Sequence, residues 1–204
     1  MLNATNIAIA IAVLSLAVSA TQFWFTSLRR GQLRMTTSPI IFFGYEYNHA
    51  VSKLSAKIIL RPLLYSTSAH GKVIESMYVR LLCDGNECTF SFWGYGVPNN
   101  PLTVGGLYVG QTGVAAFQHF LLPSHTADYQ FEQGSYTIDV FARLVSKTIP
   151  LKLARLRVAL SADLAAALAQ MDGVLFELDP GSQVYRGHRH GRLDVGAESA
   201  GPLS

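Results

Sequence analysis

The chain has 204 residues, of which 50% are hydrophobic and 14% are charged, and its formal net charge is +3. Arg29, Arg30 and Arg34 account for this excess, because the basic and acidic residues that follow them are equal in number. Binding to nucleic acid needs a concentrated basic face. The composition therefore excludes a basic nucleic-acid-binding domain, and no nucleic-acid partner is expected.

Residues 7–28 (IAIAIAVLSLAVSATQFWFTSL) contain no charged residue, proline or glycine. At about 1.5 Å per residue a helix of this length spans a hydrocarbon core of about 30 Å. Its serines and threonines are tolerated in lipid because they hydrogen-bond to the preceding turn. The segment predicts a transmembrane helix. A signal peptide cleaved after Ala20 is the alternative, but there is no basic residue before the apolar run, which continues to Phe25.

The three arginines predict the orientation of the span. Basic residues beside a span favour the cytoplasmic side, and none precedes residue 7. We expect a single-pass protein of a bacterial cell membrane, with its N-terminus outside and its domain in the cytoplasm; a periplasmic domain is the alternative. The lipid bilayer is the first expected partner. The expected organisation is a short tail (1–6), the span (7–28), a basic link (29–39), a β domain (40–187) and a flexible tail (188–204).

From residue 40 the pattern changes to short apolar or alternating runs separated by turn signals. Strands are predicted at 40–47, 57–64, 73–83, 88–95, 102–109, 114–122, 136–145, 151–160 and 174–178. Pro62 indicates an edge or a bulge in the second run. Spacing of about ten residues is typical of an antiparallel sandwich or barrel. The predicted fold is mainly β: an antiparallel β-sandwich, immunoglobulin-like by analogy, with one short C-terminal helix at 162–170 that Ser161 caps and Gly173 ends.

Cys83 and Cys88 flank an Asp84-Gly85 turn signal, which predicts a hairpin. In a periplasmic domain the two cysteines could form a disulfide, and in a reducing cytosol they would stay thiols. Two cysteines supply half of a zinc site, so no metal is expected.

Three segments carry a resemblance: residues 61–81 (RPLLYSTSAHGKVIESMYVRL), 106–123 (GLYVGQTGVAAFQHFLLP) and 134–144 (GSYTIDVFARL). Together with the N-terminal span they resemble small single-pass membrane proteins found across bacteria, over most of residues 7–187. The resemblance implies a membrane-anchored β domain. It implies no activity, so it assigns no catalytic residue.

No nucleophile elbow, Walker-type phosphate loop or dinucleotide-binding glycine motif occurs, and no catalytic residue or cofactor is assigned. Trp93 and Tyr95 are candidates for ligand contact, although core packing is the more economical interpretation. His119 is a third candidate. The interpretation favoured over it is a buried histidine whose ring forms a hydrogen bond. His188 and His190 stand in a polar tail, where metal binding is uncommon. Glu75 and Asp139 would serve a hydrolase only if they converge.

These features favour a membrane-anchored, non-catalytic β domain that binds a protein partner or associates with itself. The alternative is an exported carbohydrate- or peptide-binding domain or a hydrolase. A third hypothesis is a subunit whose span packs within a larger membrane complex, since small alanines alternate with isoleucines from residue 7 to residue 13.

Overall fold

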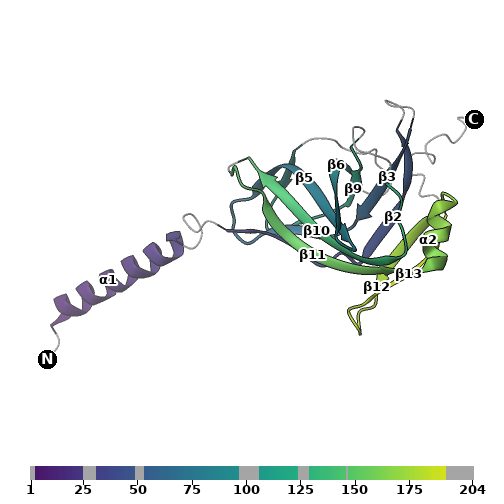
Figure 1. The fold of residues 1–204 in the computed structure, drawn as a ribbon. Coiled ribbons are helices and arrows are strands. Elements are labelled where there is room, and N and C mark those ends of the chain that lie inside the picture. Colours follow the sequence, from purple (N-terminus) through teal and green to yellow (C-terminus); the bar gives the residue numbers. More distant parts are fainter. Residues whose placement is uncertain are drawn as a thin grey trace, which may run out of the picture.

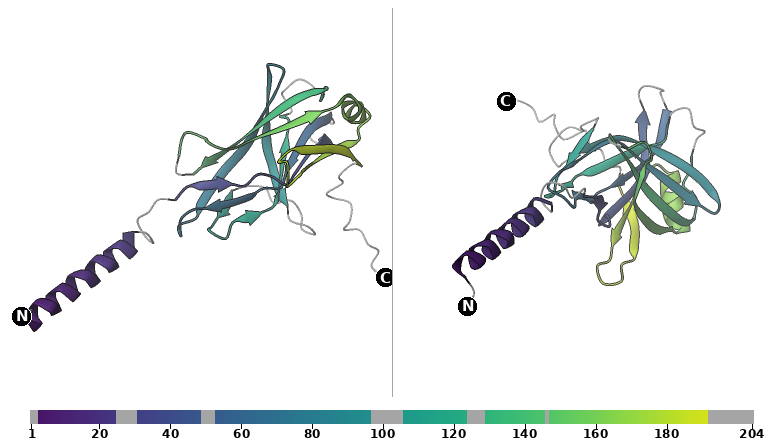
Figure 2. Two further views of the ribbon diagram at one scale, coloured as in Figure 1. Left: turned by 90° about the horizontal axis from the view of Figure 1, so that it is seen from below. Right: turned by 90° about the vertical axis from the view of Figure 1, so that its left-hand side faces the viewer.

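A computed structural model describes residues 3–24, 31–48, 53–96, 106–123, 129–145 and 147–191. It consists of an isolated apolar helix and a β domain with one short helix (Figure 1). The helix leaves the domain at one end, and the short helix lies at the other (Figures 1 and 2).

α1 (Ala4–Phe23) has 20 residues, and none of them is buried. At about 1.5 Å per residue it is about 30 Å long, which matches a bilayer core. The Ser15 hydroxyl donates to the carbonyl oxygen of Ile11 at 2.9 Å, and that of Thr21 to Ala17 at 2.7 Å. These are the hydrogen bonds expected of hydroxyl groups in an apolar helix. α1 is consistent with a membrane anchor or a signal sequence; the last residues of the predicted span, 25–28, lie outside the described residues.

Most strands belong to one antiparallel sheet. Along the sheet the order is β11-β10-β5-β6-β9-β3-β2-β12-β13, and β7 also pairs with β5. Their bounds are β2 (Ile40–Asn48), β3 (Lys53–Leu60), β5 (Lys72–Cys83), β6 (Asn86–Gly96), β7 (Leu107–Val109), β9 (Phe117–Leu121), β10 (Gly134–Leu144), β11 (Leu151–Leu160), β12 (Gly173–Leu178) and β13 (Tyr185–His190).

This sheet curves until its two edge strands, β11 and β13, come into contact, so it is nearly closed into a barrel (Figure 1). The mainly β, antiparallel class predicted from the sequence is confirmed. The predicted sandwich is not, because one continuous sheet encloses the core in place of two facing sheets. Closure of this kind leaves few unpaired strand edges.

A second, three-stranded sheet has the order β1-β4-β8, with β1 (Leu33–Met35), β4 (Leu63–Ser66) and β8 (Val114–Ala115). β1 lies within the predicted link, which had been assigned no strand. The predicted strands 57–64 and 114–122 are each divided between the two sheets. In the first, Arg61 and Pro62 separate β3 from β4, as a proline without an N–H donor favours.

α2 (Ala162–Ala169) begins at Ser161, whose hydroxyl oxygen accepts the N–H of Leu164, so the predicted cap is confirmed. The helix ends before Met171, which has a φ of 68°, and not at Gly173. His188 and His190 lie in β13 and not in a polar tail, because the register of β13 pairs His190 with Gly173.

β10 and β11 connect the two ends of the barrel. β10 begins at Gly134 and β11 ends at Leu160, and these two paired residues lie beside α2. The turn that joins the two strands lies at the opposite end. At about 3.3 Å per residue the ten residues of β11 cover about 30 Å. Because the strands of a barrel are tilted and curved, the end near α2 and the end near β1 are at most about 30 Å apart, and they lie at opposite sides of the domain (Figure 2).

Candidate ligand-binding site

Phe131 closes the interior of the barrel at the end near α2. Its side chain is 4% exposed and stacks on Phe43, with ring centroids 4.7 Å apart and an interplanar angle of 17°. Tyr45 and Tyr129 approach the same ring edge-on, at 5.8 Å and 5.2 Å. Aromatic pairs with these geometries contribute beyond the area they bury. Phe131 therefore forms a rigid floor at this end.

Two hydrogen bonds hold the segment that carries Phe131. The Tyr136 hydroxyl donates to the carbonyl oxygen of Glu132 at 2.6 Å, and the Phe131 N–H donates to the Tyr45 hydroxyl oxygen at 3.4 Å. Burial raises the pKa of Tyr136 and of Tyr45 above the ordinary value. Both phenols are therefore neutral at physiological pH, so these contacts persist.

A cavity of about 560 Å³ lies above this floor and opens to solvent. Cavities of this volume accept small molecules, and the mouths of β-barrels are common places for them. The lining comes from β2, β3, the residues just after β9, the segment before β10, and α2 with the turn that follows it. Its residues are Tyr45, Leu54, Ser55, Leu122, Pro123, Tyr129, Gln130, Phe131, Glu132, Gln133, Ala165, Ala166, Ala169 and Met171.

The side of the cavity formed by α2 is lined by small residues. Ala165, Ala166 and Ala169 face it, whereas Leu168 of the same helix is fully buried elsewhere in the core. Alanine has the highest helix propensity and the smallest side chain after glycine. The helix is thereby stable, and it leaves room where a longer side chain would fill the space.

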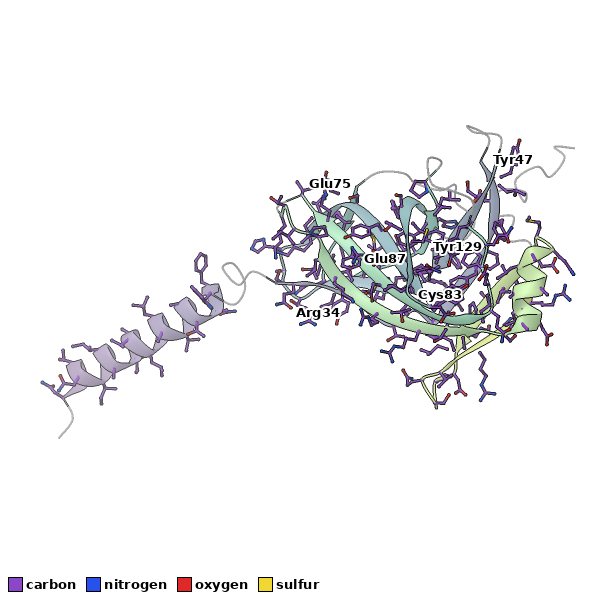
Figure 3. All side chains as sticks on the ribbon, in the orientation of Figure 1. Arg34, Tyr47, Glu75, Cys83, Glu87 and Tyr129 are labelled. Carbon is purple, nitrogen blue, oxygen red and sulfur yellow. The ribbon has the colours of Figure 1, made fainter. Side chains whose placement is uncertain are left out.

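Six of the fourteen described lining residues carry a polar side-chain group, and Glu132 is the single charged residue among the fourteen. Burial raises the pKa of Tyr129 to about 12, so its phenol stays a neutral hydrogen-bond donor. Figure 3 shows Tyr129 at the end of the barrel away from α1. The described part of the lining has no basic residue, so an anionic ligand there would meet Glu132 without a counter-charge. A neutral or cationic ligand with an apolar body fits the cavity better.

The side chains of Trp93 and Tyr95 lie outside the described residues. Their backbone is part of β6, where the register with β9 shifts between Phe92 and Gly94. Trp93 is therefore at a bulge, and Tyr95 pairs with Gln118. The prediction that they contact a ligand stays a prediction.

His119 is buried in β9, between register partners on β3 and β6. Within the described ranges neither ring nitrogen has a hydrogen-bond partner, unlike the satisfied histidine we expected. Burial, together with the nearby Lys57 cation, lowers its pKa to about 3. Lys57 pairs with Glu46 across the two strands. The imidazole is thus neutral, and it does not line the cavity, so it gains no support as a ligand contact there.

Cys83 and Cys88 lie in the hairpin predicted for them, whose two turn residues Asp84 and Gly85 have φ values of 47° and 85°. The register places Cys83 opposite Asn86 and Cys88 opposite Leu81, and both thiols are free. Burial raises the pKa of each thiol. No group of three histidine, cysteine or acidic side chains converges in the part of the chain that the structure describes.

The two carboxylates considered for a hydrolase do not converge. Asp139 pairs in register with Arg80. Arg80 is five positions along β5 from Glu75, so about 16 Å of strand separates Glu75 from the partner of Asp139. The carboxylate of Asp139 is also occupied by the side chains of Arg155 and Lys152. A paired-carboxylate mechanism would need both groups free and a few ångströms apart.

Sequence patterns had not selected the cavity residues. The aromatic residues Tyr129 and Phe131 just before β10 were the signal available, together with the run of alanines in α2. Comparison of the chain with protein-family models, curated proteins and solved structures found no match. The resemblance to small single-pass bacterial membrane proteins stays a prediction.

Proposed function

We propose that this chain is a membrane-anchored binding protein, whose barrel takes up a small neutral or cationic ligand with an apolar body in the cavity beside α2. The cavity itself is the observation that carries the proposal: its described residues combine an aromatic floor, a wall of alanines and a single acidic residue. α1 would hold the barrel at the bilayer, and the arginines after it favour a cytoplasmic domain. The described residues of the cavity include no arrangement of catalytic groups that would favour an enzyme.

A protein partner is the second candidate, as the sequence suggested. Three apolar or aromatic side chains near the cavity, Tyr47, Leu54 and Met171, are more than a third exposed. A peptide segment of a partner would cover them while it placed one side chain in the cavity. Exposed apolar groups around a pocket are typical of such contacts.

The test uses the full chain in lipid nanodiscs and three fluorinated naphthalene probes, which differ only in bearing a hydroxymethyl, an aminomethyl or a carboxylate group. Ligand-detected fluorine NMR reports binding. At roughly 0.3 kcal/mol per non-hydrogen atom, a probe of about a dozen such atoms has a Kd on the order of 1 mM. We expect the alcohol and the amine to bind and the carboxylate to bind at least tenfold more weakly.

A matched pair of α2 variants identifies the site. Ala166→Leu combined with Ala169→Leu fills the cavity and should abolish binding, while leucine keeps a high helix propensity. Ala162→Leu, on the same helix but outside the lining, should bind as the wild type does. Equal binding by all three proteins, after subtraction of empty nanodiscs, would contradict the proposal. If the probes fail but a peptide library binds the wild type and not the cavity-filled variant, the partner is a protein.

A further inference from the structure

Four apolar side chains are exposed together at the end of the barrel opposite the cavity. They are Val73, Tyr108, Val145 and Ile149, with exposed fractions of 45%, 63%, 67% and 80%. Val73 and Tyr108 are register partners on β5 and β7, and the Val145 N–H donates to the carbonyl oxygen of Val73 at 3.2 Å. Ile149 belongs to the turn between β10 and β11. We call these four side chains the apolar tip.

The chain enters the domain at this same end. The N–H of Gln32 donates to the Thr67 hydroxyl oxygen at 2.9 Å, and the Thr67 N–H donates to the Gln32 carbonyl oxygen at 3.0 Å. Thr67 begins the loop that leads into β5. Tyr108 lies over that loop, because a Cβ atom on Gly71 would come within 2.3 Å of its ring. Figure 3 likewise places Arg34 and Glu75 at the end that faces α1.

The connection to α1 is short. Six residues, 25–30, separate Trp24 from Gly31. A chain extends at most about 3.6 Å per residue, so the domain begins within about 25 Å of the end of the helix. If α1 spans a bilayer, the apolar tip is confined to the neighbourhood of the lipid surface.

Several basic residues lie at the same end of the barrel as the tip. Arg34, Lys72, Arg143 and Lys147 lie on or beside the elements that form it, and Glu75 is an acidic residue on β5 near them. Arg29 and Arg30 immediately precede the domain. Apolar groups ringed by lysine and arginine are the pattern of surfaces that enter the boundary between anionic headgroups and acyl chains.

We infer that the apolar tip inserts into the headgroup boundary of the bilayer that holds α1, with its basic residues on anionic headgroups. The barrel then stands on the membrane with its cavity at the end that faces away from the lipid. This arrangement keeps the cavity open to ligands from the aqueous phase. The inference rests on the anchoring role proposed for α1, but not on ligand binding.

Fluorescence quenching tests the contact in the full chain, in nanodiscs whose lipids carry bromine on the acyl chains. Cys83 and Cys88 are replaced by serine, and a nitrobenzoxadiazole label is attached through Ile149→Cys. The control label is attached through Gln170→Cys, at the far end of the barrel. We expect quenching and a blue-shifted emission at position 149 and neither at position 170. Anionic lipid should strengthen the quenching and the blue shift at position 149. Lys147→Ser should reduce the apparent partition of the tip into anionic lipid by up to about fivefold.

Apolar contacts are tested with the label kept at position 149. Val73→Ser with Val145→Ser should remove most of the quenching, because both side chains are exposed and contribute little to folding. Val184→Ser is the matched control: Val184 is also exposed, at 58%, but lies on the turn between β12 and β13. Figure 1 shows that turn projecting away from the tip. An equal loss of quenching in the double variant and in the Val184→Ser control would overturn the inference.

A label attached through Leu14→Cys, within α1, distinguishes insertion of the tip from anchoring of the chain by α1. Quenching at position 14 without quenching at position 149 overturns tip insertion and leaves the anchor intact. No quenching at either position overturns both. If quenching at position 149 disappears when each disc holds one chain, the tip is a contact between copies and the inference fails.

Discussion

Asp139 on β10 is a buried carboxylate held by two basic side chains of β11. Its oxygens accept hydrogen bonds from Arg155 at 2.7 and 2.8 Å and from Lys152 at 2.6 Å. The hydrogen bonds from Arg155 are the main cause that lowers its pKa to about 2, against the opposing effect of burial. This cluster stabilises the pairing of β10 with β11, the two strands that connect the ends of the barrel.

The cluster predicts a pH dependence of stability. Because the pKa of Asp139 is lower in the folded chain than its ordinary value of 3.8, the contribution is complete above about pH 4 and is lost as the pH falls towards 2. Lys152 and Arg155 are half-exposed and screened by water, so we expect it to amount to about 1 kcal/mol. Asp139→Asn should lower stability by that amount at pH 7 and flatten its decline below pH 4, as measured by denaturant unfolding.

Glu75→Gln is the control for this prediction, because Glu75 is an exposed acidic residue on the adjacent strand β5. It should leave both the stability at pH 7 and its decline in acid unchanged. If the wild type and Asp139→Asn lose stability in parallel between pH 4 and pH 2, the ion pairs do not act as described.

Single residues with a local geometric role were predictable from the sequence. The Asp84-Gly85 turn and the Ser161 cap depend on neighbours a few positions away, and both are found where expected. The burial of His119 and the partners of Asp139 were not predictable, because they depend on strands distant in the sequence. Alternation along one strand does not reveal which strand lies beside it.

At the scale of elements, the hairpin of β5 and β6 is fixed by its turn. Both turn residues have positive φ, which matches the right-handed twist of the strands, and Gly85 adopts this conformation without a Cβ penalty. A Cβ atom on Gly85 would meet no other group within 4 Å. Any cost of a side chain there therefore comes from the backbone alone.

Gly85→Ala should lower the stability of the folded chain by about 1 kcal/mol, the cost of a left-handed conformation for a residue with a Cβ atom. In a domain of this size that corresponds to a decrease in Tm of about 3 °C. Gly181→Ala, at an exposed turn glycine outside the positive-φ set, should change the Tm by less than half as much. Thermal unfolding of the two variants side by side measures the difference; equal shifts would contradict the role of the turn.

Long strands and α2 were predictable because their patterns extend over eight or more residues, as in β2, β5, β10 and β11. The short strands β1, β4 and β8 were missed or merged with their neighbours, since two to four residues carry no period. β13 was missed for another reason: its sequence, YRGHRH, is polar, and most of its side chains are exposed. Its pairing with β12 places it in the sheet.

For the whole molecule, the sequence predicted a β domain after an apolar helix but not the closure of the sheet. Sandwich and barrel have the same strand lengths and turn spacing. They differ in strand order, and here β5 lies between β6 and β10 while β9 lies between β6 and β3. The cavity follows from that closure together with the position of α2. Its lining is drawn from five separate parts of the chain, so no local sequence motif indicates it.

The account depends most on α1 remaining attached and on the side of the membrane that the domain occupies. One measurement addresses both: the intact mass of the chain from bacterial membranes, after whole cells have been treated with a membrane-impermeant maleimide. The protein carries Gln170→Cys as its single cysteine. We predict the full-length mass, near 22.2 kDa, without an adduct from intact cells and with one adduct after lysis. A chain that lacks residues 1–20 would contradict the anchor, and a full-length adduct from intact cells would contradict the cytoplasmic orientation.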